Sequence, residues 1–320
     1  MRALLLVLGL AACAPMIDAP GPTISEARLA DDGFYATDGV RLGLRQWRPT
    51  KPPKAVILAL HGFNDYSNFF DAPGRFLADA GILSYAYDQR GFGESPNPGT
   101  WAGVDGYVAD AVAMVEALKR RHPKTPFYLL GDSMGGAVAM VTLTHHNAPE
   151  VDGVILAGPA VWGRATMPWY QRAALWLGAH TLPSMTLTGR GLNIKPSDNY
   201  EMLVALGRDP LILKETRIGT VFGLVNLMDQ AFDSASKLRR RALVLYGEKD
   251  EIIPHRPTRL MLKSLPDGQR VAIYENGYHM LLRDLDAKTA WTDIAAWIDN
   301  PNAALPSGAD KRDIGVLAAD

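Results

Sequence analysis

The sequence of 320 residues contains a single cysteine, Cys13. One cysteine cannot form an intrachain disulfide or build a thiolate zinc or iron–sulfur site, because those features need several cysteines. Neither sign of charge is in excess, since 33 Lys and Arg residues accompany 34 Asp and Glu residues, a formal net charge of −1. The lack of a basic excess argues against a nucleic-acid partner. The seven histidines include no HExxH pair, so we predict neither a metal nor a cofactor.

The N-terminus carries a short apolar run, Ala3 to Ala12, directly after Met1-Arg2. The run is too short to span a bilayer, and one positive charge before it is typical of a secretory signal peptide. It ends in Leu10-Ala11-Ala12-Cys13, which resembles the bacterial lipobox, where the cysteine is diacylated and becomes the first mature residue. We therefore predict a signal peptide over residues 1–12 and lipid attachment at Cys13. Cleavage after Ala14, giving a soluble secreted or periplasmic protein, is the alternative.

A diacylated cysteine with an amide-linked chain anchors a protein firmly in a membrane. Asp is absent directly after Cys13, and by the sorting pattern of Gram-negative lipoproteins this favours the outer membrane, facing the periplasm. The chain to about Ser25 is rich in Pro, Ala and Gly, so residues 13–30 are predicted to be a flexible tether. The composition after Asn300 predicts a disordered tail over residues 300–320.

From Val40 onward, short apolar runs alternate with helical patterns. Continuous apolar runs of this length are typical of strands covered on both faces, whereas the alternating segment 40–47 predicts an edge strand. The runs are Ala55–Leu60, Ile82–Tyr87, Phe127–Leu130, Val154–Ala157, Ala242–Tyr246 and Val271–Tyr274. Residues 108–118 and 291–298 have apolar side chains at the spacing of an amphipathic helix. We predict an α/β fold, with a mostly parallel sheet and helices on both faces.

Residues 161–238 interrupt this alternation and contain no clear strand. We predict that they form an inserted helical cap between two parts of the core, residues 31–160 and 239–299. Trp162, Trp169 and Trp176 recur at a spacing of seven residues and could form one apolar helical stripe, although Pro168 disfavours a continuous helix. The tryptophans either face a substrate or membrane or simply pack the cap onto the core, and the sequence leaves both possibilities open.

A nucleophile motif follows the third of the apolar runs. It reads Gly131-Asp132-Ser133-Met134-Gly135-Gly136 and precedes a helix-compatible segment. This is G-x-S-x-G between a strand and a helix, where a serine is lifted onto a sharp turn and its neighbours must lack side chains. We predict that Ser133 is a nucleophile.

A nucleophilic serine needs a base in reach and a third group that orients the base. In this architecture the acid and then the histidine follow at the ends of later strands. Asp250 comes just after the run 242–246, and His279 lies in the loop after the next strand. We predict Ser133, Asp250 and His279 as the catalytic residues, with Glu248 and Glu251 as alternative acids.

The tetrahedral intermediate needs N–H donors aimed at its oxyanion. The N–H of Met134 stands at the start of the predicted helix, where amides are unpaired. The second predicted donor is the N–H of Phe63, in the loop His61-Gly62-Phe63 after the run 55–60.

Together these motifs resemble the monoacylglycerol lipase and lysophospholipase-like branch of the α/β-hydrolase fold, a group also classed with serine aminopeptidases. The resemblance rests on these motifs and on further segments that match it: Tyr87-Asp88-Gln89-Arg90-Gly91-Phe92-Gly93-Glu94-Ser95, Ser197-Asp198-Asn199, Asp209-Pro210-Leu211, Gly247-Glu248-Lys249-Asp250 and Gly277-Tyr278-His279. It implies the nucleophile, acid, base and oxyanion roles given above, and an acyl pocket beneath the cap. Phe63 is bulkier than the residue common in the family, which implies a narrower pocket. The signal peptide and lipid anchor are not part of the family pattern.

The resemblance implies a serine hydrolase that cleaves carboxylic esters through an acyl-enzyme. Its expected substrates are small amphiphilic esters with an apolar acyl chain, such as monoacylglycerols or lysophospholipids. One alternative is an aminopeptidase or amidase on the same residues, with Glu201, Asp209 and Glu215 of the cap as candidates to hold an α-amine. Another is a lipoprotein that keeps the fold as a non-catalytic binding module. The sequence does not determine the oligomeric state.

Overall fold

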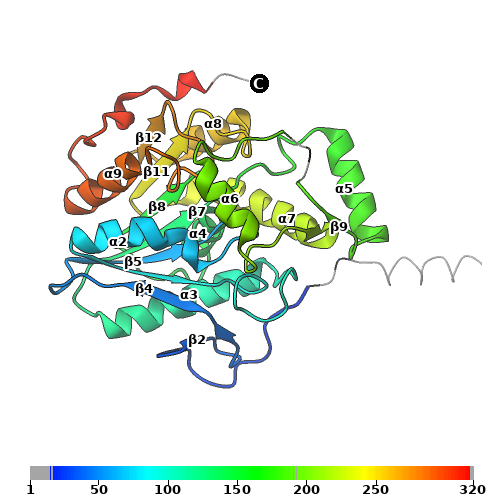
Figure 1. Cartoon of the computed structure of the whole chain (residues 1–320), viewed down its shortest axis with the longest axis horizontal. Coiled ribbons are helices and arrows are strands. Elements are labelled where there is room, and N and C mark those ends of the chain that lie inside the picture. The colour runs from blue at the N-terminus through cyan, green and yellow to red at the C-terminus, as the bar shows by residue number, and fades with distance from the viewer. Residues whose placement is uncertain (1–14, 16, 190, 192, 318–320) are drawn as a thin grey trace, which may run out of the picture.

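A sheet of seven strands runs through the molecule in the order β12-β11-β8-β7-β5-β6-β4 (Figure 1). The computed structural model describes residue 15 and residues 17–189, 191 and 193–317. Neighbouring strands are parallel, except that β4 is antiparallel to β6 at the sheet's edge. The strands are β4 (Leu44–Trp47), β5 (Ala55–Leu60), β6 (Ile82–Tyr87), β7 (Phe127–Asp132), β8 (Gly153–Ala157), β11 (Ala242–Gly247) and β12 (Arg270–Tyr274). The predicted mostly parallel α/β fold is confirmed.

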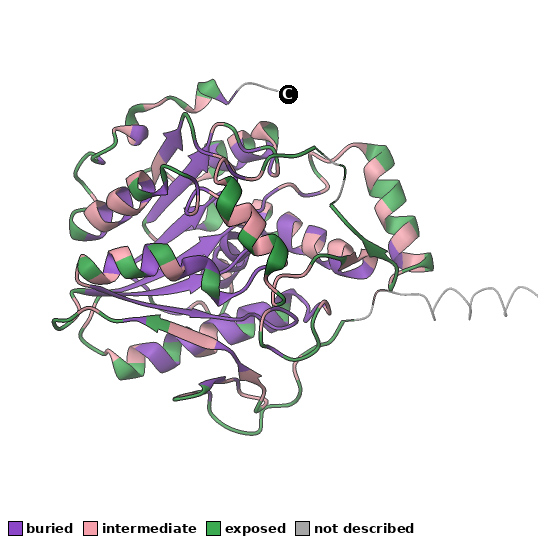
Figure 2. Ribbon diagram, in the orientation of Figure 1, coloured by how far each residue is buried: buried purple, intermediate pink, exposed green. Residues whose placement is uncertain are grey.

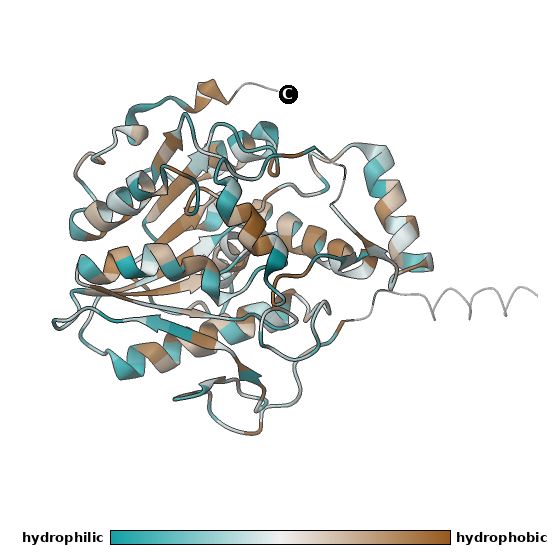
Figure 3. Cartoon of the chain, in the orientation of Figure 1, coloured by the Kyte–Doolittle hydropathy of each residue, from teal (hydrophilic) through white to brown (hydrophobic). Residues whose placement is uncertain are grey.

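Each central strand supplies two hydrophobic cores, one on each face of the sheet. In β5, residues 56, 58 and 60 join one cluster of buried side chains, whereas residues 55, 57 and 59 join the other. Successive side chains of a strand point to opposite faces, so a strand between two helical layers must be apolar at every position. This is why the runs in the sequence are uninterrupted. Figures 2 and 3 show the strands as buried, apolar bands.

Helices cover both faces of the sheet. α3 (Val104–Arg121), α4 (Met134–Thr144) and α8 (His255–Ser264) pack into the cluster on one face. On the other face, α2 (Asp71–Asp79) and α9 (Ala287–Asp299) pack into the second cluster. The helical patterns predicted over residues 108–118 and 291–298 therefore lie in α3 and α9.

Residues 161–238 leave the sheet after β8 and return to it at β11. They hold α5 (Trp169–Thr181), α6 (Tyr200–Arg208), α7 (Ile218–Ser234) and the short 3-10 helix η2 (Ala235–Lys237). The segment, in which the sequence shows no clear strand, is largely helical and also holds one short strand pair, because β9 (Thr186–Leu187) pairs antiparallel with β10 (Thr216–Arg217). The two strands have two residues each, too few for an alternation to be visible in the sequence.

The three tryptophans of the cap do not form one helical stripe. α5 begins at Trp169, directly after Pro168 in an extended conformation, and Trp162 lies before the helix. Trp169 and Trp176 are 77% and 55% exposed, whereas Trp162 is partly buried. In Figure 1, α5 stands at the side of the molecule farthest from α9.

The N-terminal segment is bound to the core. The backbone N–H of Asp18 donates to the carbonyl of Trp101 at 2.8 Å, and the Asp18 carboxylate accepts hydrogen bonds from Asn97 and Thr100. The expectation of a flexible tether is therefore wrong at Asp18, because the loop 97–101 satisfies its polar groups. The predicted signal peptide and Cys13 lie outside the described residues. Among the helices that are described, none is both long and apolar enough to cross a membrane.

A small antiparallel sheet follows this segment, made by β1 (Arg28–Ala30), β2 (Gly33–Tyr35) and β3 (Arg41–Leu42). β1 lies inside the range predicted as a tether. Its three residues pair with β2 in register from Arg28 opposite Tyr35 to Ala30 opposite Gly33.

The C-terminal segment also departs from expectation. Residues 300–317 fold onto the sheet, so the prediction of a disordered tail is wrong for them. Leu305 and Ala309 join the cluster on the α9 face, and Leu317 joins the cluster on the opposite face. The segment includes two 3-10 helices, η3 (Ala309–Lys311) and η4 (Ile314–Val316). A few buried apolar side chains hold it in place, and its Pro- and Ala-rich composition conceals them.

Candidate active site

Ser133 lies on the turn between β7 and α4. Its backbone has φ 51° and ψ −112°, a conformation that residues other than glycine rarely adopt. The flanking glycines are required by packing. A Cβ atom on Gly131 would lie 2.3 Å from the carbonyl oxygen of Gly135, and one on Gly135 would lie 2.1 Å from that of Leu60. The turn can therefore form only if both positions lack a side chain.

The structure brings the three predicted catalytic residues into one hydrogen-bonded chain. His279 Nε2 lies 2.9 Å from Ser133 Oγ, and His279 Nδ1 lies 2.8 Å from Asp250 Oδ2. The other carboxylate oxygen, Asp250 Oδ1, accepts hydrogen bonds from the N–H groups of Ile252 and Ile253. These bonds fix the orientation of the carboxylate, so that its free oxygen faces the imidazole.

Two opposing effects act on the pKa of His279. Burial lowers the pKa of His279, because a charged ring is poorly solvated there, but the charge of Asp250 and its hydrogen bond outweigh burial. The pKa is raised above its usual value of about 6.5. A base with this pKa gains a proton from a hydroxyl more readily than a free imidazole does.

The alternative acids lie elsewhere. Glu248 forms an ion pair with Arg312, and the carboxylate of Glu251 accepts a hydrogen bond from the backbone N–H of Lys195. Neither is hydrogen-bonded to His279 in the described structure. Asp250 is therefore the acid that the geometry favours.

The two predicted oxyanion donors belong to different loops, one after β7 and one after β5. Met134 is the first residue of α4, so its N–H has no acceptor in a preceding helical turn. Phe63 follows β5, and its ring packs edge-to-face against Phe92, with 5.7 Å between the ring centroids. Its side chain thus forms part of the wall of the pocket beside Ser133.

The loop that carries Phe63 is tied to the cap. The carbonyl of Asn64 accepts a hydrogen bond from the N–H of Leu213 at 3.1 Å, and the side chain of Asn64 donates to Thr216. Asn64 itself has a positive φ of 63°, which asparagine tolerates better than most residues. The position of the loop that carries Phe63 therefore depends on the cap as well as on the sheet.

A cavity of about 410 Å³ opens beside Ser133 and His279, between the core and the cap. Most of its wall is apolar. Its apolar lining residues are Phe63, Ala160, Trp162, Met167, Pro196, Val221, Leu224, Val225, Met228, Ile252, Ile253 and Met280. A pocket of this size and character suits an acyl chain, with the reacting carbonyl placed at Ser133.

Three charged side chains line the same pocket, and sequence reasoning missed their role. Arg283 forms an ion pair with Asp65, which joins the oxyanion loop to the loop of His279. Asp132, directly before Ser133, is 5% exposed. Burial raises the pKa of Asp132 to about 6, and the charge of Arg283 opposes this shift. Two features of the sequence could have indicated these charges: Arg283 lies four positions after His279, and Asp132 is an acid inside the G-x-S-x-G motif.

The acids proposed for an α-amine site lie away from this cavity. None of Glu201, Asp209 and Glu215 is among its lining residues. Asp209 accepts a hydrogen bond from the hydroxyl of Tyr66, and Glu215 accepts one from Thr186. Within the described part of the chain, no group of three or more His, Cys, Asp or Glu side chains is arranged to hold a metal ion.

Comparisons with known proteins agree with this geometry. Residues 51–286 match the family described as "Serine aminopeptidase, S33". The chain is 26% identical to a monoacylglycerol lipase of Mycolicibacterium smegmatis, over 84% of this chain and 96% of the relative. It is also 26% identical to the human monoglyceride lipase, over 83% and 89%.

Solved structures show the same fold. A soluble variant of the monoglyceride lipase from Saccharomyces cerevisiae, in complex with a substrate analog, matches with a TM-score of 0.70 at 18% identity. The match covers 89% of this chain and 98% of that one. The predicted inserted cap and mostly parallel sheet thus belong to the α/β-hydrolase fold.

Proposed function

The chain belongs to the serine aminopeptidase S33 family and is a carboxylic ester hydrolase of the lipase and esterase type; we propose that Ser133, Asp250 and His279 form its catalytic triad. The observation that carries this proposal is the hydrogen-bonded chain of the three residues at the mouth of an apolar pocket. The proposed substrates are small amphiphilic esters with an apolar acyl chain.

In the proposed reaction, Ser133 Oγ attacks the ester carbonyl while His279 Nε2 takes the hydroxyl proton. The N–H groups of Phe63 and Met134 stabilise the resulting oxyanion. His279 then gives its proton to the leaving alcohol, which produces the acyl-enzyme. Water, deprotonated by the same imidazole, attacks the acyl group and releases the acid. Asp250 accepts the Nδ1–H bond throughout and stabilises the imidazolium.

The charges at the pocket favour a neutral leaving group over a phosphate. Arg283 is the cation among the described residues that line the pocket, and Asp65 already neutralises it. Asp132 adds a second carboxyl group nearby. An anionic phosphate would face these acids, whereas the hydroxyl groups of a glycerol can donate hydrogen bonds to them. We therefore propose monoacylglycerols ahead of lysophospholipids.

A substrate panel tests this function. We expect hydrolysis of p-nitrophenyl esters of graded chain length and of monoacylglycerols, and a loss of at least about 10³-fold in kcat for Ser133→Ala. A fluorophosphonate probe should label the wild-type chain and not the variant. Hydrolysis that persists in Ser133→Ala, or faster cleavage of aminoacyl anilides than of esters, would contradict the proposal. The second result would favour the aminopeptidase alternative.

We also propose that the protein is exported and held by a lipid on Cys13 at the outer membrane, facing the periplasm. Pro15 supports a membrane-facing cap, since its Cβ lies 3.7 Å from where a Cβ on Gly219 of α7 would stand. Pro15 comes two residues after Cys13 in the sequence, so the described residue next to the proposed lipid attachment is seated on the cap.

Exposed apolar side chains gather on this part of the cap. They are Trp169, Tyr170, Trp176, Leu177, Leu182, Met185 and Leu187. Such a surface beside a lipid anchor suits contact with a bilayer. Mass spectrometry of the mature N-terminus and fractionation of Cys13→Ala test the anchor. A variant that stays in the outer-membrane fraction, or a mature chain that starts after Ala14, would contradict it.

A further inference from the structure

The C-terminal segment reaches the two loops that carry the proposed acid and base. After α9, residues 300–317 run along the edge strand β12 and are held by the buried side chains of Leu305, Ala309 and Leu317. Arg270, at the start of β12, forms an ion pair of 2.6 Å with Asp310. This segment lies beyond residue 286, where the family match ends.

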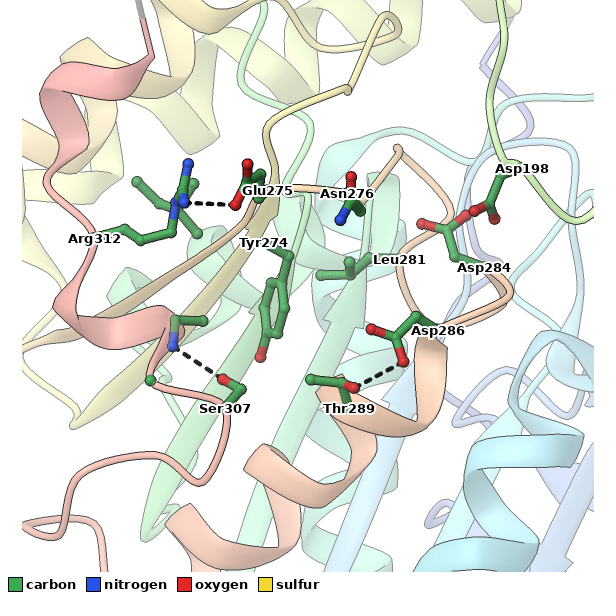
Figure 4. Close-up of a pocket in the computed structure, with 14 residues that line it drawn as sticks. Asp198, Tyr274, Glu275, Asn276, Leu281, Asp284, Asp286, Thr289, Ser307 and Arg312 are labelled. Carbon is green, nitrogen blue, oxygen red and sulfur yellow. Dashed lines mark hydrogen bonds and ion pairs between the residues drawn. The ribbon is translucent and has the colours of Figure 1, made fainter.

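Arg312 is the point at which the segment meets both loops. Its Nη2 lies 2.5 Å from Glu248 Oε2, and its Nη1 lies 3.0 Å from Glu275 Oε2. Figure 4 shows Arg312 pointing at Glu275, with Asn276 farther along the same loop. Arg312, Glu275 and Asn276 line a cavity of about 330 Å³. One guanidinium therefore joins two carboxylates from different parts of the chain.

The two glutamates belong to the loops of the triad. Glu248 lies two residues before Asp250, and Glu275 lies four residues before His279. The loops also touch directly, because the N–H of Lys249 donates to the carbonyl of Gly277 at 2.9 Å. A Cβ on Gly247 would lie only 2.4 Å from Gly277, so this approach leaves no room for adjustment.

Two carboxylates held within 3.0 Å of one guanidinium repel each other when that cation is removed. Arg312 therefore does more than add an attraction, since it neutralises one negative charge on each of the loops that carry Asp250 and His279. We propose that Arg312 is a positioning residue that keeps the acid and base loops of the triad together by neutralising Glu248 and Glu275. This inference rests on the proposed triad.

The test is a charge-removal cycle in the full chain. We expect Arg312→Ala to lower kcat for a p-nitrophenyl ester by about 3–10-fold with KM within about twofold, because positioning affects the chemical step. The uncompensated negative charge should also move the acid limb of the kcat/KM profile to higher pH by about 0.5 unit. Arg312→Lys should give an intermediate kcat, since one ammonium cannot match the fork of a guanidinium.

The decisive arm adds Glu248→Gln and Glu275→Gln to Arg312→Ala. If repulsion between Glu248 and Glu275 lowers activity in Arg312→Ala, the triple variant recovers the kcat and the acid limb of the wild type. It does so although both ion pairs of Arg312 are missing. If Arg312 only anchors the tail, the triple variant stays as slow as Arg312→Ala, and the proposal fails. It also fails if Arg312→Ala behaves as the wild type. Failure of the triad itself is distinguishable, because the wild-type chain would then not react with the fluorophosphonate probe.

Discussion

The side chain of Asn64 donates a hydrogen bond of 2.7 Å to the hydroxyl of Thr216, across 152 residues of chain. Asn64 follows the proposed oxyanion donor Phe63, and Thr216 is in β10 of the cap. This bond, with the backbone bond from Leu213 to Asn64, makes the cap a support for the oxyanion loop. The cap is therefore expected to affect the rate of the chemical step as well as substrate binding.

Replacement of Thr216 tests this support. Thr216→Val keeps the shape of the side chain but leaves the partly buried amide of Asn64 without its acceptor, a loss of about 1 kcal/mol. We expect kcat to fall about 3–10-fold. Thr216→Ser keeps the hydroxyl and should retain most of the activity. Steady-state kinetics with one ester decide the matter, and equal kcat values for the two variants would contradict the role of the bond.

Asp250→Asn should lower kcat by about 10³–10⁴-fold while the fold is retained. The amide cannot stabilise an imidazolium and disturbs the tautomer of His279. The matched control is Glu251→Gln, one residue further on, whose carboxylate is bonded to Lys195 instead. It should change kcat by less than about threefold. A control that loses as much activity as Asp250→Asn would reopen the choice of acid.

Asp132 makes stability depend on pH. Burial raises its folded-state pKa to about 6, above about 3.9 in the unfolded chain. The folded state therefore holds the proton more tightly, and stability falls as pH rises from about 4 to 6 and then stays low. Asp132→Asn removes this loss, so the free energy of unfolding at pH 8 should rise by about 1–3 kcal/mol.

Urea unfolding of Asp132→Asn at pH 4 and pH 8 measures this effect. The control is Asp267→Asn, since Asp267 is exposed in a loop, and its pH dependence should match that of the wild type. If the free energies of unfolding of the wild type and Asp132→Asn differ by the same amount at pH 4 and pH 8, the prediction is wrong. That result would show that Arg283 fully compensates the charge of Asp132.

The exposed tryptophans of α5 should contribute to membrane binding. We expect Trp169→Ser with Trp176→Ser to weaken binding to phospholipid vesicles at least tenfold in a protein that lacks the lipid, because each indole buries a large apolar area on insertion. Leu285→Ser is the control, since Leu285 is 72% exposed but lies in the loop before α9 and not in α5. If the parent protein, the double tryptophan variant and Leu285→Ser all bind vesicles equally well, the proposed contact of α5 with the bilayer is wrong.

Much of the site could be predicted from local patterns. The strand runs were readable because strands packed on both faces must be apolar throughout, as in β5. The turn at Ser133 could be predicted because positions 131 and 135 must be glycine. A side chain at either position would clash with backbone a few residues away or in a neighbouring strand. The order of Asp250 and His279 followed from strand ends that meet at one edge of a parallel sheet.

The ends of the chain and the charged contacts were not predictable in this way. Asp18 is held on the loop 97–101 by one backbone acceptor and two side-chain donors far along the chain, and three scattered apolar residues hold the tail. The pairing of Arg283 with Asp65 joins residues 218 positions apart. No periodicity marks such contacts.

The sequence by itself determined the layers of the fold and the sharp turn that carries Ser133, because hydrophobic periodicity and steric limits at glycine act over short stretches of chain. Only the tertiary structure decided which acid faces His279, what lines the pocket and how the C-terminal segment meets the loops of the site. Those outcomes depend on distances between groups that the chain brings together only when it folds. The strength of an ion pair or a hydrogen bond is set by these distances in space and not by separation along the sequence.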